Sequence, residues 1–234
     1  MSSFDRAPFL ASCDLIDWQS DALRELAARL TSGAAGLETI SILFDWVRDS
    51  IAHTGDAGRG RITLRASEVL RERTGLCYAK SHLLVALLRA TNIPAGLCYQ
   101  RLRLDDGVPS FVLHGLVGVQ MPDQRFLRID PRGNKPGINA QFTPGRESLA
   151  FAATHPGEVD LPGVFARPIP AVVAALSGAH SWHPVETRLP DVRPEHWPAA
   201  EMEWSAPAST ADSNSDRAGA SRGTRPQRTT RANT

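Results

Sequence analysis

The first half of the chain spaces its apolar residues as α-helices do. Residues 17–30 and residues 37–51 each carry apolar side chains three and four positions apart, so one face of each helix would be buried. A Ser-Gly pair at 32–33 ends the first of these helices. The pattern therefore predicts two amphipathic helices before residue 52.

Two further helices follow a glycine-rich interruption. Residues 66–73 predict a short helix with Ser67 as its N-cap. Residues 76–91 predict a long, mostly apolar helix with Thr74 as its N-cap, and Pro94 prevents its continuation.

Beyond Pro94 the period of the pattern falls to two residues. Residues 96–104 alternate, residues 110–120 are β-branched and apolar, and residues 124–132 alternate again. Turn-forming residues separate these three segments, which predicts an antiparallel meander. Helices followed by a meander indicate an α+β fold rather than repeated βαβ units.

The remainder of the chain changes in composition. Residues 136–200 are rich in proline, and we expect them to wrap the domain in extended segments with one short helix. From about Ser205 onward there is no bulky apolar residue, and a segment that cannot bury apolar surface stays disordered. We expect one domain over residues 1–200, with its core at about 38–145, and a disordered tail at 201–234.

Charge and cysteine content exclude several classes of protein. The 234 residues include 26 basic and 25 acidic ones, a net charge of +1 that does not indicate binding to nucleic acid or to a membrane surface. No segment reads as a transmembrane helix, and the start does not read as a secretory signal. Three widely spaced cysteines indicate neither a disulfide framework nor a zinc site. We expect a cytoplasmic protein without a metal.

Cys77 lies at the beginning of the long predicted helix, in the segment TGLCYAKSH. Backbone N–H groups are unpaired at a helix start, and the positive end of the helix dipole favours a thiolate, the form of cysteine that attacks carbonyl groups. Apolar residues further along the same face would hold the helix in the core. Cys77 is therefore a candidate nucleophile, and a small buried cysteine is the alternative.

A histidine and an aspartate occupy the second and third predicted strands. His114 interrupts an apolar strand, where a polar side chain needs a partner. A turn near 122–123 pairs position 114 with 130 or 131, so Asp130 would lie within reach of His114. The arrangement predicts a triad in which His114 takes the proton of Cys77 and Asp130 holds the imidazole. A purely structural His–Asp pair is the alternative.

The runs ASEVLRERTGLCYAKSHLLVALLRATNIPAGLCYQ, LHGLVGV and RIDPRGN together resemble the transglutaminase-like superfamily of papain-type cysteine enzymes. In that superfamily a helix opens with Gly-x-Cys, and a histidine and an aspartate lie on successive strands. The resemblance, over about residues 38–145, implies that Cys77 is the nucleophile, His114 the base and Asp130 the orienting acid. It also implies a papain-like core with N-terminal helices packed on a short antiparallel sheet.

The chain departs from the pattern of that superfamily after the histidine. Family members often carry an aromatic residue there, whereas Gly115 and Leu116 follow here. The aromatic residue that borders the cleft would then come from Trp46, Tyr78 or Tyr99.

Two side chains are further candidates for contact with the substrate. Lys80, one turn along the helix from Cys77, is a candidate to stabilise the thiolate or to bind a substrate carboxylate. The backbone N–H of Cys77 is the natural first donor to an oxyanion, and Gln100 is the candidate for the second. A structural or solvent-exposed position is the alternative for both side chains.

We therefore expect a thiol enzyme in which Cys77 attacks an amide or thioester carbonyl and forms an acyl-enzyme. Water would complete a peptidase or amidase reaction on a peptide, a protein or a small amide, and an amine would complete an acyl transfer. The sequence does not choose between them, and the resemblance favours hydrolysis. The alternatives are an arylamine acetyltransferase-like enzyme, which acetyl-CoA would acylate, and a non-catalytic binding module. The chemistry requires no cofactor.

Overall fold

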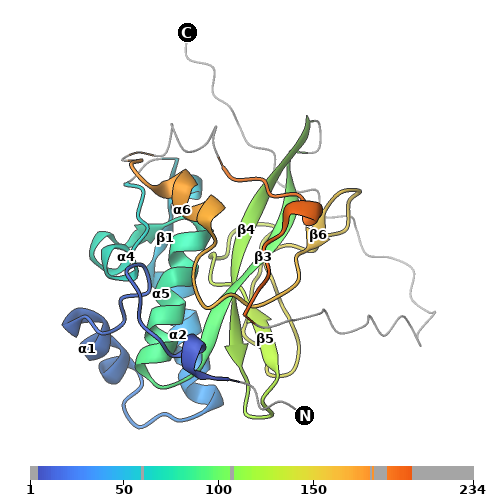
Figure 1. Cartoon of the computed structure of the whole chain (residues 1–234). Helices are drawn as coiled ribbons and strands as arrows, with labels where there is room; N and C mark the ends of the chain where they lie inside the picture. Colours follow the sequence, from blue (N-terminus) through green and yellow to red (C-terminus); the bar gives the residue numbers. More distant parts are fainter. Residues whose placement is uncertain (1–4, 59–60, 106–107, 180, 182–188, 202–234) are drawn as a thin grey trace.

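The computed structural model describes residues 5–58, 61–105, 108–179, 181 and 189–201, and it stacks a layer of helices against an antiparallel sheet (Figure 1). This architecture confirms the α+β prediction. The predicted tail, apart from Glu201, lies outside the described residues. The division into a domain of 1–200 and a tail stays a prediction.

The helices of the described residues follow the apolar periods of the sequence. They are η1 (Ala7–Phe9), α1 (Asp21–Leu30), α2 (Leu37–Ser50), α3 (Thr54–Ala57), α4 (Ala66–Glu72), α5 (Cys77–Ala90), α6 (Pro170–Leu176) and η2 (Pro194–His196). The two predicted amphipathic helices correspond to α1 and α2, and the long apolar one corresponds to α5.

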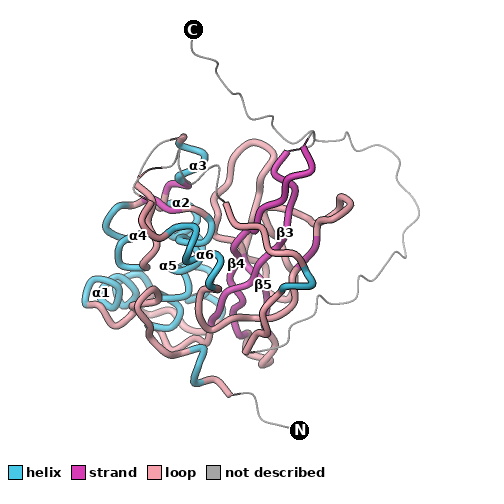
Figure 2. The backbone as a smooth tube through the Cα atoms, turned by 45° about the horizontal axis from the view of Figure 1, so that its top comes forward, coloured by secondary structure: helices cyan, strands magenta, loops and turns pink. Residues whose placement is uncertain are grey.

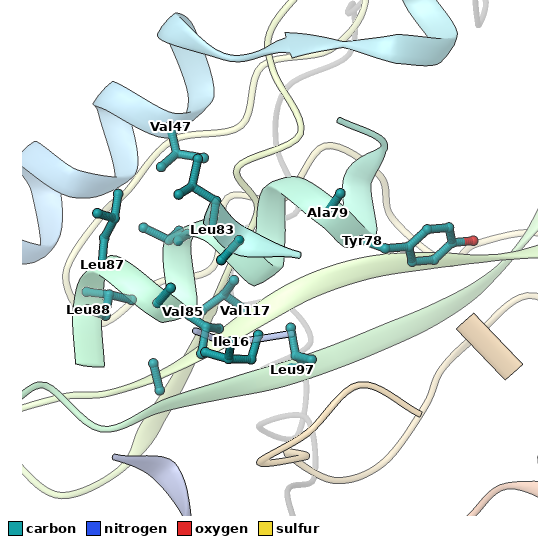
Figure 3. Packing of buried hydrophobic residues seen from close by; sticks show 14 of the residues in the cluster. Ile16, Val47, Tyr78, Ala79, Leu83, Val85, Leu87, Leu88, Leu97 and Val117 are labelled. Carbon is teal, nitrogen blue, oxygen red and sulfur yellow. The ribbon is translucent and has the colours of Figure 1, made fainter. Parts of the chain in front are cut away.

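Helix α5 is the centre of the core. Every residue from Cys77 to Arg89 is buried, because the helix packs between α2 on one side and the sheet on the other. Figure 3 shows this packing, with Val47 of α2 on one side of the helix and Leu97 and Val117 of the strands on the other. A helix enclosed in this way has little freedom to tilt, so its first residue is held firmly.

The sheet contains four of the described strands in the order β5-β4-β3-β6, all antiparallel. They are β3 (Ala95–Asp105), β4 (Val108–Gln120), β5 (Phe126–Ile129) and β6 (Val159–Asp160). The first three form the predicted meander, and β6 comes from the proline-rich segment. Figure 2 shows β3, β4 and β5 on one side of the molecule and α1, α2, α4 and α5 on the other.

A second, very short sheet joins two segments of the helical layer. Strand β1 (Ala52–His53) pairs in parallel with β2 (Thr74–Gly75), and His53 lies opposite Gly75. Strand β2 ends just before α5, so this pairing brings the end of α2 and the residues after it to the start of α5.

The starts of α4 and α5 correct two predicted N-caps. Arg65 precedes α4, and Ser67 lies inside it, where its backbone N–H and hydroxyl donate to the carboxylate of Asp17 at 3.0 and 2.5 Å. Thr74 belongs to β2, and its hydroxyl bonds with that of Thr54 at 2.9 Å. Both hydroxyls bond with residues distant in sequence, and a local capping pattern does not predict such partners.

Candidate active site

Cys77 is the first residue of α5, directly after the N-cap Leu76, whereas the predicted N-cap Thr74 would make Cys77 the third helical residue. Its residue is 8% exposed, and its sulfur accepts a hydrogen bond at 3.5 Å from the backbone N–H of Gly115 in β4. No side chain caps the start of α5, which leaves the backbone N–H of Cys77 available to an acceptor. The sulfur therefore lies where the helix dipole and a strand N–H both favour negative charge.

The contact between α5 and β4 depends on a glycine. A Cβ atom at Gly115 would lie 2.8 Å from Cδ1 of Tyr78 and 3.1 Å from its Cα, so only glycine permits this approach. The Tyr78 hydroxyl donates to the backbone oxygen of Leu113, and the residue is buried. Tyr78 therefore fixes the start of α5 against the strand that carries His114.

His114 and Asp130 form a buried hydrogen-bonded pair, with His114 Nε2 2.8 Å from Asp130 Oδ2. The register differs from the predicted pairing of position 114 with 130 or 131. Val117 opposes Ile129, so continuing the ladder would place Asp130 opposite Leu116 rather than His114. Because a shift of two residues keeps side chains on the same face, Asp130 still reaches His114 along the diagonal.

Two backbone N–H groups complete the surroundings of Asp130. Arg132 donates its N–H to Oδ1 at 3.0 Å, and Ala150 donates to Oδ2 at 3.0 Å. Burial raises the pKa of Asp130, but the charge of His114 and these hydrogen bonds outweigh it, and the pKa lies below 3.8. The carboxylate is therefore charged and held in one orientation, although its residue is 0% exposed.

The pKa of His114 is raised from 6.5 to about 9. Burial lowers this pKa, whereas the charges of Asp130 and Cys77 and hydrogen bonds to both raise it by more. Since Nε2 is bonded to Asp130, Nδ1 is the ring nitrogen that remains for the sulfur of Cys77. The environment thus favours a protonated imidazole.

Phe151 borders the imidazole, and the sequence did not identify it. Its ring meets that of His114 edge-on, with centroids 5.0 Å apart and an interplanar angle of 85°. Phe151 lies in the proline-rich segment, which carries no period to place it. Of the predicted aromatic residues, Trp46 packs under the guanidinium of Arg73, and Tyr99 contacts Phe165 and Trp197 in the core.

Gln100 lies opposite His114 in the ladder between β3 and β4. Its side-chain amide nitrogen donates to Asp160 Oδ1 at 2.7 Å and to the backbone oxygen of Phe151 at 3.3 Å. Both amide hydrogens are thus used within the protein. This corrects the expectation that Gln100 is the second donor to an oxyanion.

Lys80 points to the end of α2. Its ammonium group donates to the backbone oxygens of Arg48 at 3.0 Å and Ile51 at 2.5 Å, and the residue is 0% exposed. Burial lowers its pKa to about 7, with a further contribution from the charge of Arg132. These contacts give Lys80 a structural position, in place of the expected contact with a substrate carboxylate.

A further charged group lies in α3, and the sequence did not identify it. Asp56 accepts two hydrogen bonds of 2.8 Å from Arg132 and a third from Lys135. The backbone N–H of Asp56 donates to His53 Nδ1 at 3.3 Å. His53 and Asp56 lie in or beside the glycine-rich interruption, and the pairing of β1 with β2 places His53 opposite Gly75, two residues before Cys77.

The described residues contain no cluster of three or more His, Cys, Asp or Glu that could hold a metal ion. None of the helices in the described part of the chain combines the length and the apolar character of a membrane span. A surface cavity of about 540 Å³, lined by Arg101, Phe111 and Asp191 among others, contains none of Cys77, His114 or Asp130.

Comparison with known protein families finds a match over the core of the chain. Residues 24–131 match the model of the transglutaminase-like superfamily, and this confirms the resemblance inferred from the motifs. Cys77, His114 and Asp130 all lie within the matched residues. No curated protein matches the chain.

Several solved structures are similar to parts of the chain. A candidate cysteine protease from Cytophaga hutchinsonii is 22% identical, with 53% of this chain and 41% of that protein covered and a TM-score of 0.43. The periplasmic domain of TgpA from Pseudomonas aeruginosa, bound to ethylmercury, is 21% identical, with 46% and 42% covered and a TM-score of 0.36. A candidate protease from Parabacteroides distasonis is 18% identical, with 59% and 31% covered and a TM-score of 0.36. The chain spans less than half the length of each.

Proposed function

Because residues 24–131 carry the core of the transglutaminase-like superfamily, we propose that this protein is a thiol enzyme with Cys77, His114 and Asp130 as its catalytic residues. The observation that carries the proposal is the environment of His114. The imidazole is bonded to a buried carboxylate on one side, and the charge of Cys77 raises its pKa from the other. A structural His–Asp pair would not require a cysteine at a helix start beside it.

The reaction begins with the transfer of the Cys77 proton to His114 Nδ1. The sulfur forms a bond to the carbonyl carbon, and the carbonyl oxygen takes the negative charge. The carbon–nitrogen bond of an amide, or the carbon–sulfur bond of a thioester, then breaks as His114 protonates the leaving group. Water or an amine attacks the acyl-enzyme, gives its proton to His114 and releases Cys77.

The substrate proposed is a peptide, a protein or a small amide, and hydrolysis is the outcome we favour. Acyl transfer would need a cleft that excludes water while it admits an amine. An arylamine acetyltransferase-like reaction and a non-catalytic binding module remain the two alternatives. A cytoplasmic location stays a prediction.

The experiment that tests the proposal is alkylation of the protein by iodoacetamide as a function of pH, in wild type and in His114→Ala. We expect rapid, selective labelling of Cys77 in the wild type, and a much slower reaction in His114→Ala. Cys98 is the internal control, because burial raises the pKa of its thiol to about 12 and the residue is 0% exposed. Slow labelling of Cys77 in both folded proteins would contradict the proposal and favour a binding module.

A second assay separates the possible reactions. The protein is acylated with p-nitrophenyl acetate, and the acyl group is then traced to acetate or to an added amine such as glycine methyl ester. Predominant acetate supports a hydrolase, and predominant amide supports acyl transfer. Stable acetylation of Cys77 by acetyl-CoA would favour the arylamine acetyltransferase-like alternative.

A further inference from the structure

The oxyanion that forms in the proposed reaction needs two hydrogen-bond donors, and the residues considered so far provide one. The backbone N–H of Cys77 is available at the start of α5. Gln100 has both amide hydrogens engaged with Asp160 and Phe151. A second donor must therefore come from another residue near Cys77.

His53 lies beside the segment that leads into α5. It opposes Gly75 in the parallel pair of β1 and β2, and Gly75 precedes Cys77 by two residues. Paired strands lie about 4.8 Å apart, so the backbone of His53 runs next to the start of α5. The charge of His114 is among the charges that lower the pKa of His53, so the two side chains are close enough to interact electrostatically.

The tautomer of His53 follows from its hydrogen bond. Nδ1 accepts the backbone N–H of Asp56 at 3.3 Å, and a backbone N–H can only donate. The proton of a neutral His53 ring is therefore on Nε2. Within the described part of the chain, no partner is recorded for this N–H, and the side chain is 12% exposed. His53 thus has an N–H for which the described residues provide no acceptor.

The surroundings keep this ring neutral. Burial lowers the pKa of His53 well below 6.5, and the positive charges of Arg132, Lys80 and His114 contribute. The negative charge of Asp56 acts in the opposite direction, but Arg132 and Lys135 both bind that carboxylate. A neutral donor does not compete with His114 for the thiol proton.

Lys80 forms a hydrogen bond with the segment that leads into the strand of His53. Its ammonium group, on the same helix as Cys77, donates to the backbone oxygen of Ile51 at 2.5 Å. Ile51 precedes His53 by two residues, so the position of β1 relative to α5 is fixed from both sides: by the β1–β2 pairing and by this lysine.

On this geometry we propose that His53 is the second oxyanion donor, its Nε2–H bonding the carbonyl oxygen attacked by Cys77 together with the backbone N–H of Cys77. The proposal rests on the proposed function. It assigns a catalytic contact to a residue outside the triad, and it moves no proton, because the hydrogen stays on Nε2 throughout the reaction.

The test compares two reactions of Cys77 that differ in their need for an oxyanion donor. Alkylation by iodoacetamide forms no oxyanion, whereas acylation by p-nitrophenyl acetate does. Variants His53→Phe, without a donor, and His53→Gln, with an amide donor that reaches a similar distance, are compared with the wild type. His196→Phe, at an exposed position, is the matched control.

We expect His53→Phe to lower the acylation rate by about a hundredfold to a thousandfold, as the loss of one oxyanion donor does elsewhere, while the alkylation rate is retained. His53→Gln should recover part of the acylation rate, and His196→Phe should behave as the wild type. If His53→Phe does not fold, His53→Leu, which also lacks a donor, is used in its place.

Three results would overturn the assignment. Acylation of a folded His53→Phe at the wild-type rate would show that another group binds the oxyanion. A parallel fall in alkylation and acylation would show that His53 acts on the thiolate instead. A wild type in which Cys77 is not alkylated would overturn the proposed function itself, and this inference with it.

Discussion

Replacing Asp130 by asparagine should change the pH dependence of stability, because the charge of Asp130 helps to keep His114 protonated. The rise in the pKa of His114 from 6.5 to about 9 corresponds to about 3 kcal/mol in favour of the protonated ring. Since the folded pKa is raised, this stabilisation is complete below pH 6.5 and is lost as the pH rises through about 9. Asp130 remains charged in this range, because its pKa lies below 3.8.

The assay is urea unfolding of wild type and Asp130→Asn at about pH 5.5 and about pH 9.5, followed by tryptophan fluorescence. Asp130→Asn should be destabilised at both pH values, since it loses an acceptor for the backbone N–H groups of Arg132 and Ala150. The loss should be larger at the lower pH, by up to about 3 kcal/mol.

The matched control is Asp191→Asn. Asp191 binds Arg101 through two hydrogen bonds of 2.6 and 2.8 Å, and an arginine keeps its charge across this pH range. The loss of stability in Asp191→Asn should therefore be the same at both pH values. An equal loss at both pH values in Asp130→Asn as well would refute the inference that Asp130 holds His114 in its charged form.

Two further predictions concern the packing of α5. Gly115→Ala should lower the free energy of unfolding by about 1–3 kcal/mol and slow the alkylation of Cys77, because the added Cβ would lie 2.8 Å from Tyr78. Urea unfolding and a labelling rate that both match the wild type would contradict this prediction. Lys80→Met addresses the buried lysine, whose pKa is lowered to about 7 chiefly by burial. Between about pH 7 and about pH 10, Lys80 is neutral in the folded protein but still protonated in the unfolded chain. The stability of the wild type relative to Lys80→Met, measured by urea unfolding, should therefore rise with pH over this range. A stability difference that does not change with pH would contradict the lowered pKa of Lys80.

The fold was largely predictable because its main signals are local. The helical spacing in residues 37–51 and the apolar run from 76 each report which face of a segment is buried, and α2 and α5 follow them. The change to a period of two after Pro94 likewise predicted the meander. The register differs from the predicted pairing of position 114 with 130 or 131, and His114 still bonds with Asp130, because Leu116, which the extended ladder places opposite Asp130, lies on the same face as His114.

The surroundings of the candidate site were less predictable because they depend on segments distant in sequence. Asp160, sixty residues further along the chain, accepts a hydrogen bond from the amide of Gln100. Phe151 contacts His114 from a segment whose sequence shows no helical or strand periodicity. The carbonyl oxygens that bind Lys80 lie at the end of another helix. No local pattern reports such partners, and they decide whether a polar side chain is free to bind a substrate.

The sequence by itself determined the elements, the α+β class and the three residues expected to act together, since these follow from spacing of side chains along one segment or across one hairpin. Only the tertiary structure decided which neighbouring groups are already engaged and which donor is free. Gln100 and His53 show the difference, since both are polar residues in strands. Asp160 and Phe151, which come from a distant segment, accept hydrogen bonds from the amide of Gln100. The Nε2–H of His53 has no such partner in the described residues.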